Sequence, residues 1–417
     1  MRRRLGRDAA DPCAGALTAG AVADAPPGRT LLAFGAVSFA YFAYSGLFLT
    51  YAPLWYQSLG YSTLAIGVLS SVQSATRVAS PYAWGWVADQ TGRRERVLQV
   101  AVGLSLICAC GFLIAPDYAW TMVVTAALFV CTAGVIPISE AALAHLVSRG
   151  GTLDAGRYGR VRVWGSFGFI LAVSTSGFVL QTVGVGRFPV LLIALLALLL
   201  IAALRLPVLP EAPHDASGIG RALAVLKRPA VAWFFAGLFF TVLAHTSLYA
   251  FFSLYLDSLG YSRSAVGLIW ATSVAVEVVW FWYQGAFASR LSMHGWLIAA
   301  ALLSALRFAL VAAFGAVPWL LVLSQGLHAV TFAAQHTACI AVVNRYFPGR
   351  LRGRGQALYT VLGYGIPGVL GGVAGGALIQ ALGYAAVFWA ASGCGVLAAV
   401  CCWRAWALEH SRPGGAG

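Results

Sequence analysis

Ser58-Leu59-Gly60-Tyr61-Ser62 is repeated further along the chain as Ser258-Leu259-Gly260-Tyr261-Ser262, and each copy opens a long apolar segment. The first copy continues through Ile66-Gly67-Val68-Leu69, and the second continues through Val266-Gly267-Leu268-Ile269. A repeat that keeps a constant register indicates two related halves of one architecture. We therefore expect the chain to be built from two similar units.

Opposite charges stand at matching places in the two apolar segments. Arg77 falls in the middle of the first segment, and Glu277 falls at the same register in the second. An ionisable side chain within such a segment is costly and is functional by default. This difference indicates that the two halves have taken different chemical roles.

The composition is that of an integral membrane protein. Hydrophobic residues make up 60% of the chain and charged residues only 10%. Apolar runs of about 20 residues, each long enough to cross a bilayer as a helix, recur along almost the whole length. We predict twelve spans, at 30–54, 64–88, 96–115, 119–143, 160–182, 188–206, 229–256, 264–288, 295–315, 318–343, 356–380 and 384–405. The expected fold is an all-α membrane protein with twelve transmembrane helices in two pseudo-symmetric six-helix bundles, because backbone groups in hydrocarbon must be hydrogen-bonded internally.

The net charge of +14 is distributed in a way that indicates topology rather than nucleic-acid binding. Most Arg and Lys residues flank the predicted spans on one side, from Arg2 to Arg412, whereas the other side has only Arg187 and Arg263. Loops rich in Lys and Arg stay in the cytoplasm. We expect a multi-pass protein of the inner (plasma) membrane with both termini cytoplasmic.

One long linker divides the chain. It carries Pro207, Pro210 and Pro213 together with several charges. We expect a disordered cytoplasmic tail (1–28), an N-terminal six-helix bundle (29–206), a central cytoplasmic loop (207–228), a C-terminal six-helix bundle (229–406) and a cytoplasmic tail (407–417). The eight cysteines form no C-x-x-C pair, so we expect neither a disulfide framework nor a metal site.

The loop Gly85–Arg94 follows the pattern G-x-x-x-D-x-x-G-R-R between the second and third predicted spans. Together with twelve spans and a central loop, this pattern resembles the signature of the major facilitator superfamily of transporters. Glycines allow two helix ends to approach closely, and Asp89 can cap a helix N-terminus or pair with an arginine across a cytoplasmic gate. The expected gating residues are Gly85, Asp89, Gly92, Arg93 and Arg94. The alternative is a generic basic loop, and the second copy has Ser289-Arg290 where Asp89-Gln90 stands, so we expect no acidic gate element there.

Five ionisable residues lie within the predicted spans. Arg77, Glu277 and Arg307 are deep, whereas Glu140 and Arg162 lie nearer the span ends. A charge at mid-helix costs on the order of 2.5–3.5 kcal/mol, which favours a functional interpretation. The alternative for a pair such as Glu140 and Arg162 is an ion pair that only locks helices together.

The stretch Arg157–Ser166 is similar to the fifth span of the proton-coupled oligosaccharide symporters and of the 3-phenylpropionate permease group. The resemblance to the oligosaccharide symporters implies that Arg162 and Glu140 help to bind sugar and that Phe169 stacks on the ring. The remaining positions that match this group are Glu277 (a substrate-binding carboxylate), Arg307 (a coupling arginine) and His328 (a histidine of the tenth span).

Other positions favour the 3-phenylpropionate permease group over the sugar symporters. Gln325 and Thr331 stand where the sugar group has a lysine and a proton-carrying carboxylate, so that group's proton site is in doubt here. Arg77 in the second span resembles the 3-phenylpropionate group. The tenth-span positions that also resemble it are Trp319-Leu320, Leu327-His328 through Phe332, and His336.

Helical spacing predicts which side chains share a face. The three faces are Tyr41, Tyr44, Phe48 and Tyr51 in the first span, Trp270, Ser273, Glu277 and Gln284 in the eighth, and Gln325, His328 and Gln335 in the tenth. The substrate-binding candidates are therefore Tyr44, Arg77, Glu140, Arg162, Phe169, Trp270, Glu277 and His328. An aromatic stripe can instead pack against a neighbouring helix. A face that carries an acid or a histidine is not suited to contact with lipid.

Charge counting favours an anionic substrate. Arg77, Arg162 and Arg307 outnumber Glu140 and Glu277 by one, and a buried cation needs a partner. An organic anion would supply that partner, and aromatic walls would hold a ring. We expect a small aromatic carboxylate of the phenylpropionate type to bind near the membrane midplane between the halves.

Proton-coupled symport by alternating access is the leading functional hypothesis, with Glu277, Arg307 and His328 as the coupling residues. The alternatives are a sugar or nucleoside proton symporter, proton-coupled drug or metabolite efflux, and a solute sensor without flux. An enzyme is not expected, because neither a nucleophile with a nearby base nor an H-E-x-x-H motif is present. The expected partners are a small-molecule substrate, protons and the lipid bilayer. We expect no nucleic acid, a monomer, and no cofactor beyond the proton gradient as energy source.

Overall fold

The structure is a computed structural model that describes residues 28–114, 117–149, 152–209 and 219–411. Residues 1–27 of the expected N-terminal tail, 210–218 of the central loop and 412–417 of the C-terminal tail lie outside the described residues. The described part is almost entirely helical. The helices of the first half are α1 (Gly28–Ser58), α2 (Thr63–Thr91), α3 (Arg94–Cys110), α4 (Tyr118–Thr132), α5 (Val135–Val147), α6 (Ala155–Val183) and α7 (Phe188–Ala203). The only strands among the described residues are β1 (Ser148–Arg149) and β2 (Thr152–Leu153), which pair antiparallel between α5 and α6.

The second half is also helical, and its helices have more interruptions. Its helices are α8 (Ile219–Leu226), α9 (Pro229–Ser258), α10 (Arg263–Phe287), α11 (Met293–Phe314), α12 (Pro318–Gly326), α13 (Gln335–Tyr346), α14 (Arg352–Thr360), α15 (Ile366–Leu382) and α16 (Tyr384–His410). Short π-helical segments, η4 (Ala329–Ala334) and η6 (Val361–Gly365), interrupt the tenth and eleventh predicted spans. Such segments are rare and are frequently found at functional sites.

Eleven stretches of the described residues are long and apolar enough to cross a membrane. The helix at the second predicted span, α2, is 29 residues long but is not among the eleven. The helical membrane class is thus confirmed, and the count of twelve spans stays a prediction. Polar side chains of α2, among them Gln73 and Arg77, line the central cavity described below, and a helix that faces a cavity does not need to be apolar all round.

The repeated sequence forms the same local structure twice. Gly60 and Gly260 both adopt φ of 83°, a left-handed conformation that favours glycine. The side chain of Ser62 then accepts a hydrogen bond from the backbone N–H of Ala65 at 3.2 Å, which caps the start of α2. Ser262 caps the start of α10 in the same way and at the same distance. The register of the two copies is therefore kept in the structure as well as in the sequence.

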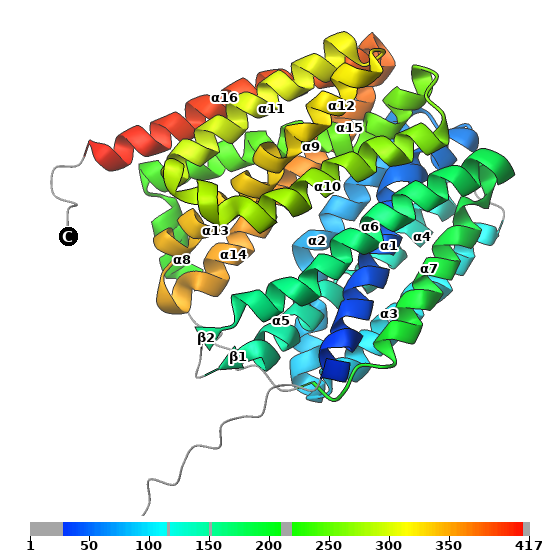
Figure 1. The fold of residues 1–417 in the computed structure, drawn as a ribbon, viewed down its shortest axis with the longest axis horizontal. Coiled ribbons are helices and arrows are strands. Elements are labelled where there is room, and N and C mark those ends of the chain that lie inside the picture. The colour runs from blue at the N-terminus through cyan, green and yellow to red at the C-terminus, as the bar shows by residue number, and fades with distance from the viewer. Residues whose placement is uncertain (1–27, 115–116, 150–151, 210–218, 412–417) are drawn as a thin grey trace, which may run out of the picture.

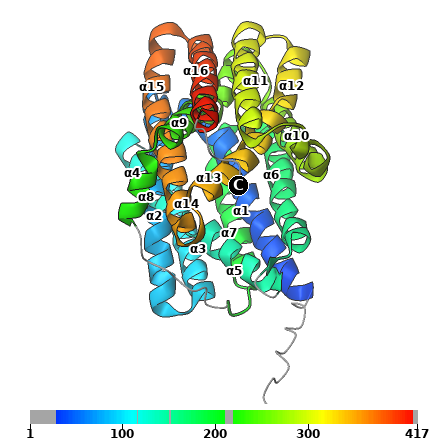
Figure 2. The same ribbon diagram turned by 90° about the vertical axis from the view of Figure 1, so that its left-hand side faces the viewer.

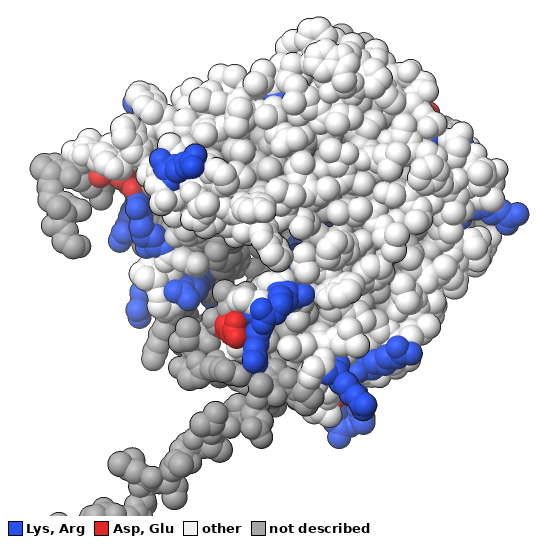
Figure 3. Space-filling view, viewed as in Figure 1, with Lys and Arg blue, Asp and Glu red and all other residues white. Residues whose placement is uncertain are grey.

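Helices of the first half gather together, and helices of the second half gather beside them, as Figures 1 and 2 show from two directions. Two pairs of helices join the halves: α2 packs along α15, and α6 packs along α10. The surface in Figure 3 has a broad band without Lys, Arg, Asp or Glu, as expected for a surface in contact with lipid.

Both seams between the halves depend on glycine. A Cβ atom on Gly67 of α2 would lie 2.2 Å from the carbonyl oxygen of Gly372 on α15. The equivalent residue of the second half, Gly267 on α10, would bring a Cβ to 2.2 Å from the carbonyl oxygen of Val173 on α6. The hydroxyl of Tyr51 adds a hydrogen bond to that same carbonyl at 2.7 Å. The halves therefore meet closely next to the loops 59–62 and 259–262, whereas Figure 3 shows the surface hollowed at the opposite end, beside β1 and β2.

Candidate substrate cavity

A cavity of about 330 Å³ lies between the two halves and receives side chains from both. A volume of this size suits a small organic molecule. Its polar and charged lining consists of Ser45, Tyr56, Ser70, Gln73, Ser74, Arg77, Arg162, Ser166, Thr246, Tyr249, Ser273, Glu277, His328 and Tyr364. Of the substrate-binding candidates predicted from the sequence, the structure brings Arg77, Arg162, Phe169, Trp270, Glu277 and His328 together in this cavity.

Aromatic side chains form much of the wall. Phe42 and Phe48 come from α1, Phe169 from α6, Tyr249 from α9 and Trp270 from α10. The rings of Tyr249 and Trp270 stack at 6.4 Å between centroids, and the indole N–H of Trp270 donates to the hydroxyl of a buried serine at 3.0 Å. Rings held in this way offer a rigid apolar surface to a flat ligand.

Arg77 supplies a positive charge to the cavity from α2. It shares one face of that helix with Ser70, Gln73 and Ser74, which lie three to seven residues before it and also line the cavity. Its side chain is exposed to the cavity, and no carboxylate of the described residues lies within 4.0 Å of it. Since an arginine stays protonated, this charge is available to an anionic ligand.

Arg162 lies at the start of α6 and is partly neutralised. Its Nε atom is 2.7 Å from the Oε1 atom of Glu140, which projects from α5, although that oxygen has no hydrogen bond of good geometry. The guanidinium also lies over the ring of Phe42, with 4.4 Å from Cζ to the ring centroid. The side chains of the pair are 38% and 31% exposed, so water screens their attraction and a ligand can compete for the arginine.

Glu277 faces His328 across the cavity wall, with 3.8 Å between Oε2 and Nε2. The other ring nitrogen of His328, Nδ1, is 2.9 Å from an Nη1 atom of Arg307. Arginine can only donate, so Nδ1 accepts and the ring proton of the neutral histidine is on Nε2. The Nε2–H of His328 is therefore on the side of the ring that faces the Glu277 carboxylate. Arg307 sets the tautomer of His328, and through it the hydrogen bonding available to Glu277.

Arg307 is fully buried behind the cavity and does not line it. Besides His328, it donates to the side-chain oxygens of Gln325 at 2.7 Å and Thr331 at 3.2 Å. Ser273, which lines the cavity, donates to the same oxygen of Gln325 at 2.8 Å. Within the described residues no carboxylate lies within 4.0 Å of Arg307, so neutral acceptors hold its charge. The ring of His328 thus lies between Arg307 and Glu277, with one ring nitrogen near each.

A row of stacked rings follows the cavity wall along η4. The rings of His328 and Phe332 stack at 5.1 Å, and Phe332 stacks on His336 at 6.1 Å. His336 is hydrogen-bonded to the hydroxyl of Tyr359 at 3.0 Å, which in turn is 3.0 Å from the hydroxyl of Tyr364 at the cavity. This polar chain joins the two helices that carry π-helical segments.

Two of the substrate-binding candidates do not line the cavity. Tyr44 is 1% exposed and is packed within the first half, with its hydroxyl 3.4 Å from that of Thr132. Glu140 contacts the cavity only through its pair with Arg162.

The predicted gating residues lie at the junction of α2 and α3, far along α2 from the seam. Gly92 ends α2 with φ of 61°, and its N–H donates to the carbonyl of Ala88 at 3.1 Å. Asp89 accepts from Arg94 at 2.6 Å, which links the last turn of α2 to the first turn of α3. Arg93 stands between the two helices, and a Cβ atom on Gly85 would meet nothing within 4 Å.

Several lining residues were missed by the sequence analysis. Ser70, Gln73 and Ser74 could have been found from Arg77, because residues three, four and seven positions earlier lie on the same helix face. Tyr249 and Tyr364 carry no comparable signal, since single tyrosines in apolar helices are common. Only the packing of α9 and η6 against the other half brings them to the cavity.

The comparisons with known proteins agree with this architecture. Residues 31–390 match the model of the MFS_1 like family. The chain is 29% identical to a probable 3-phenylpropionic acid transporter of Escherichia coli (strain K12), over 84% of this chain and 91% of that protein. It is 27% identical to a maltose permease of Geobacillus stearothermophilus, over 84% of this chain and 87% of that protein. The crystal structure of the nucleoside transporter NupG superposes with a TM-score of 0.79 at 19% identity, over 90% of this chain and 99% of that one. The family match covers most of the chain, and the protein therefore belongs to the MFS_1 like family of the major facilitator superfamily and is a multi-pass membrane transport protein.

Proposed function

We propose that the protein is a proton-coupled symporter that takes up a small aromatic carboxylate by alternating access. The observation that carries the proposal is Arg77, a cation in an aromatic-lined cavity with no carboxylate of the described residues within 4.0 Å. An arginine that faces an open cavity can bind an anion, and its planar guanidinium matches a carboxylate in a two-point contact.

The shape and polarity of the cavity support the aromatic part of this substrate. A carboxylate bound to Arg77 would leave the rest of the molecule beside Phe169, Tyr249 and Trp270. A flat ring loses little conformational freedom on binding to such walls and contributes favourable ring contacts. The relative described as a probable 3-phenylpropionic acid transporter supports the same substrate class.

Glu277 is the proposed proton carrier, with His328 as the second candidate. Glu277 is the carboxylate of the cavity lining, and its side chain is only 17% exposed. Protonation removes a buried negative charge that would otherwise compete with the substrate anion for the positive charges of the site. His328, held by Arg307, offers its Nε2–H to the charged form of Glu277. Binding of substrate and proton would thus favour each other, which is the requirement for symport.

Alternating access would occur by rocking of the halves at the α2–α15 and α6–α10 seams. The described conformation is sealed next to loops 59–62 and 259–262. With both termini cytoplasmic, as the distribution of Arg and Lys predicts, this conformation opens to the cytoplasm. The Asp89–Arg94 contact at the far end of α2 would then be part of the cytoplasmic gate.

Flux into proteoliposomes tests the proposal. Aromatic carboxylates, sugars and nucleosides are each offered with and without an inward proton gradient, and only the aromatic carboxylates should accumulate. Arg77→Gln should weaken apparent substrate affinity by about 10-fold or more, because hydrogen bonds to a charged group contribute about 1.5–3 kcal/mol. Arg187→Gln, an exposed arginine outside the cavity, is the control and should transport normally. Undiminished affinity in Arg77→Gln would refute the role of this arginine.

A second candidate substrate class is a neutral sugar or nucleoside. The hydroxyl and amide groups of Gln73, Ser70, Ser74, Ser166 and Thr246 around the cavity suit hydroxyl-bearing ligands, and one relative is a maltose permease. The same panel separates the two classes. Proton-coupled efflux is the remaining alternative. It would cause substrate to leave loaded vesicles when the proton gradient is directed into them.

A further inference from the structure

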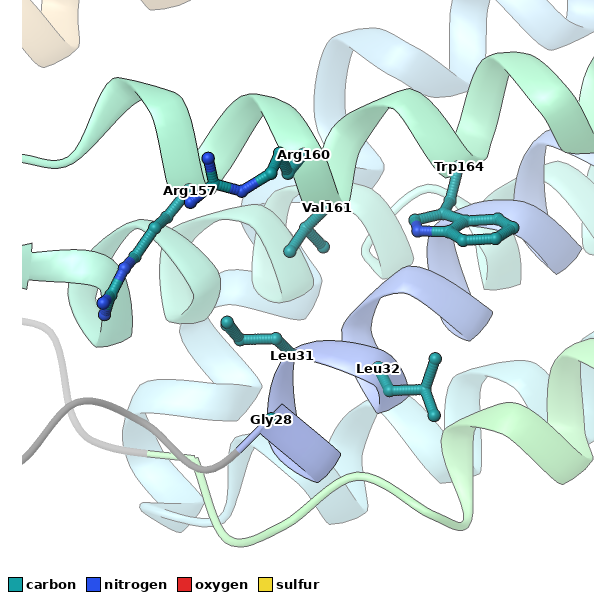
Figure 4. Close-up of a pocket in the computed structure, with 7 residues that line it drawn as sticks. All are labelled: Gly28, Leu31, Leu32, Arg157, Arg160, Val161 and Trp164. Atoms are coloured by element: carbon teal, nitrogen blue, oxygen red, sulfur yellow. The ribbon is translucent and has the colours of Figure 1, made fainter.

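A second cavity, of about 350 Å³, lies between the beginnings of α1 and α6, outside the central cavity. Figure 4 shows its lining: Gly28, Leu31 and Leu32 come from α1, and Arg157, Arg160, Val161 and Trp164 come from α6. We refer to these seven residues as the α1–α6 groove. None of them lines the central cavity, so the groove needs a separate explanation.

The groove has a cationic end and an apolar end. Figure 4 shows the side chains of Arg157 and Arg160 extending toward the start of α6, away from Trp164. Arg157 is 3.4 Å from a carboxylate oxygen of Asp154, whereas Arg160 is exposed and has no acidic partner within 4.0 Å among the described residues. The charge at this end is therefore positive overall.

The apolar end is exposed although it is strongly hydrophobic. Leu32 is 65% exposed and Trp164 is 47% exposed, and they lie beside each other in the groove. Leu31 and Val161 form the floor between the two helices. An exposed leucine and tryptophan beside two arginines form a surface with distinct polar and apolar parts, as an amphiphile has.

The location of the groove matches the edge of a bilayer. Both helices belong to stretches long and apolar enough to span a membrane, and the groove lies at their N-terminal ends. Trp164 follows Arg160 and Arg157 by four and seven residues, which corresponds to about 6–10 Å along the helix. The arginines would then lie at the level of the lipid headgroups, with Trp164 at the boundary with the hydrocarbon.

We propose that the α1–α6 groove binds an anionic phospholipid, with its phosphate at Arg157 and Arg160 and an acyl chain along Leu32 and Trp164. The two guanidinium groups match a phosphate in charge and in hydrogen-bond geometry. The apolar end distinguishes a lipid from a free anion, because inorganic phosphate would leave Leu32 and Trp164 uncovered. Basic pockets between transmembrane helices bind anionic headgroups through these same forces. The site is independent of the transported substrate.

Native mass spectrometry of the full-length protein in detergent tests this site. The protein is titrated with dioleoylphosphatidylglycerol, which is anionic, and separately with dioleoylphosphatidylcholine, which has no net charge. The wild type should retain phosphatidylglycerol more tightly. Arg157→Gln and Arg160→Gln should each weaken this binding by about fivefold, and the double variant by about 25-fold, since each basic residue near a headgroup contributes independently.

A matched control removes two arginines from other positions in the protein. The double variant Arg187→Gln with Arg205→Gln removes two exposed arginines outside the groove and should bind phosphatidylglycerol like the wild type. Leu32→Trp keeps both arginines but fills the apolar end, so it should also weaken binding of phosphatidylglycerol. Thermal unfolding of every variant in detergent checks that each is folded.

Three outcomes would overturn the proposal. The first is equal affinity of the wild type for the two lipids. The second is equal loss of phosphatidylglycerol in the groove variants and in the control double variant. The third is displacement of the lipid by millimolar inorganic phosphate, which would assign the two arginines to a free anion instead.

Discussion

Replacing Gly67 by alanine should shift the protein away from the conformation described here. Gly67 lies at the α2–α15 seam, where an added Cβ would be 2.2 Å from the carbonyl oxygen of Gly372 and 3.2 Å from the Cα atom of Gly376. These contacts involve backbone atoms, so no side chain can rotate to make room. The helices have to separate, and this separation is the movement that opens the seam.

The structure sets the size of the effect. A carbon–oxygen contact of this kind normally has a length of about 3.3–3.6 Å, so α2 and α15 must part locally by about 1 Å. Extra atoms forced into a packed interface cost about 1–3 kcal/mol. If the open-seam conformation carries none of this cost, the population ratio of the open-seam to the closed-seam conformation rises by about 5- to 150-fold. Gly267→Ala should act similarly at the α6–α10 seam, where the nearest backbone oxygen, of Val173, is again 2.2 Å away.

Cysteine accessibility measures this ratio. The eight native cysteines are replaced by serine, and Ser70, which lines the central cavity, is changed to cysteine as a reporter. A membrane-impermeant thiol reagent is applied on the side of loops 59–62 and 259–262. The closed seam protects the reporter from that side, so the labelling rate follows the population of the open-seam conformation. We expect Gly67→Ala to raise this rate by about 5-fold or more.

Gly103→Ala is the control, because a Cβ at this α3 position would meet nothing within 4 Å. Its labelling rate should equal that of the reporter protein alone. An unchanged rate in folded Gly67→Ala would mean that the seam does not limit access, and the reasoning from glycine packing would be wrong. An equal increase in Gly103→Ala would point to a general loosening of the bundle instead.

Three further predictions concern coupling, gating and topology. Glu277→Gln should still exchange substrate but should no longer accumulate it, whereas a coupled protein can reach about tenfold accumulation per pH unit and proton. Normal pH-driven accumulation in vesicles with this variant would move the proton site to His328 or Glu140. Asp89→Asn should slow transport and leave substrate affinity within a few-fold of the wild-type value, because the contact of Asp89 with α3 is distant from the cavity. Abolished substrate binding in detergent would contradict a gating role. Cysteines at Arg290 and Arg263 should be labelled from the cytoplasmic and the opposite side, respectively, and the reverse pattern would overturn the proposed orientation.

Much of the fold could be predicted because hydropathy reports contact with lipid directly. The first predicted span, 30–54, corresponds to α1, which extends to Ser58. The helix is longer than the apolar run because backbone hydrogen bonding continues beyond the hydrocarbon. The fourth predicted span, 119–143, is divided into α4 and α5 at Ala133 and Gly134. Such a local break preserves the apolar character of the segment, so composition does not reveal it.

The sequence alone determined the membrane class and identified two charges that line the central cavity. Arg77 and Glu277 could be recognised because a charge in an apolar segment is costly wherever that segment packs. The repeated sequences also form the same local structure twice, at Gly60 and Gly260, because it involves the backbone of only a few residues.

Only the tertiary structure decided which polar faces meet. Tyr44 and Phe48 belong to one predicted stripe, yet Phe48 lines the cavity and Tyr44 is buried within the first half. Likewise Arg307 contacts His328 rather than Glu277, because α11 packs behind the helix that carries the histidine. Hydropathy separates faces that contact lipid from faces that do not. It cannot tell a cavity from a helix interface, since both exclude lipid and the difference depends on how each helix is rotated against its neighbours.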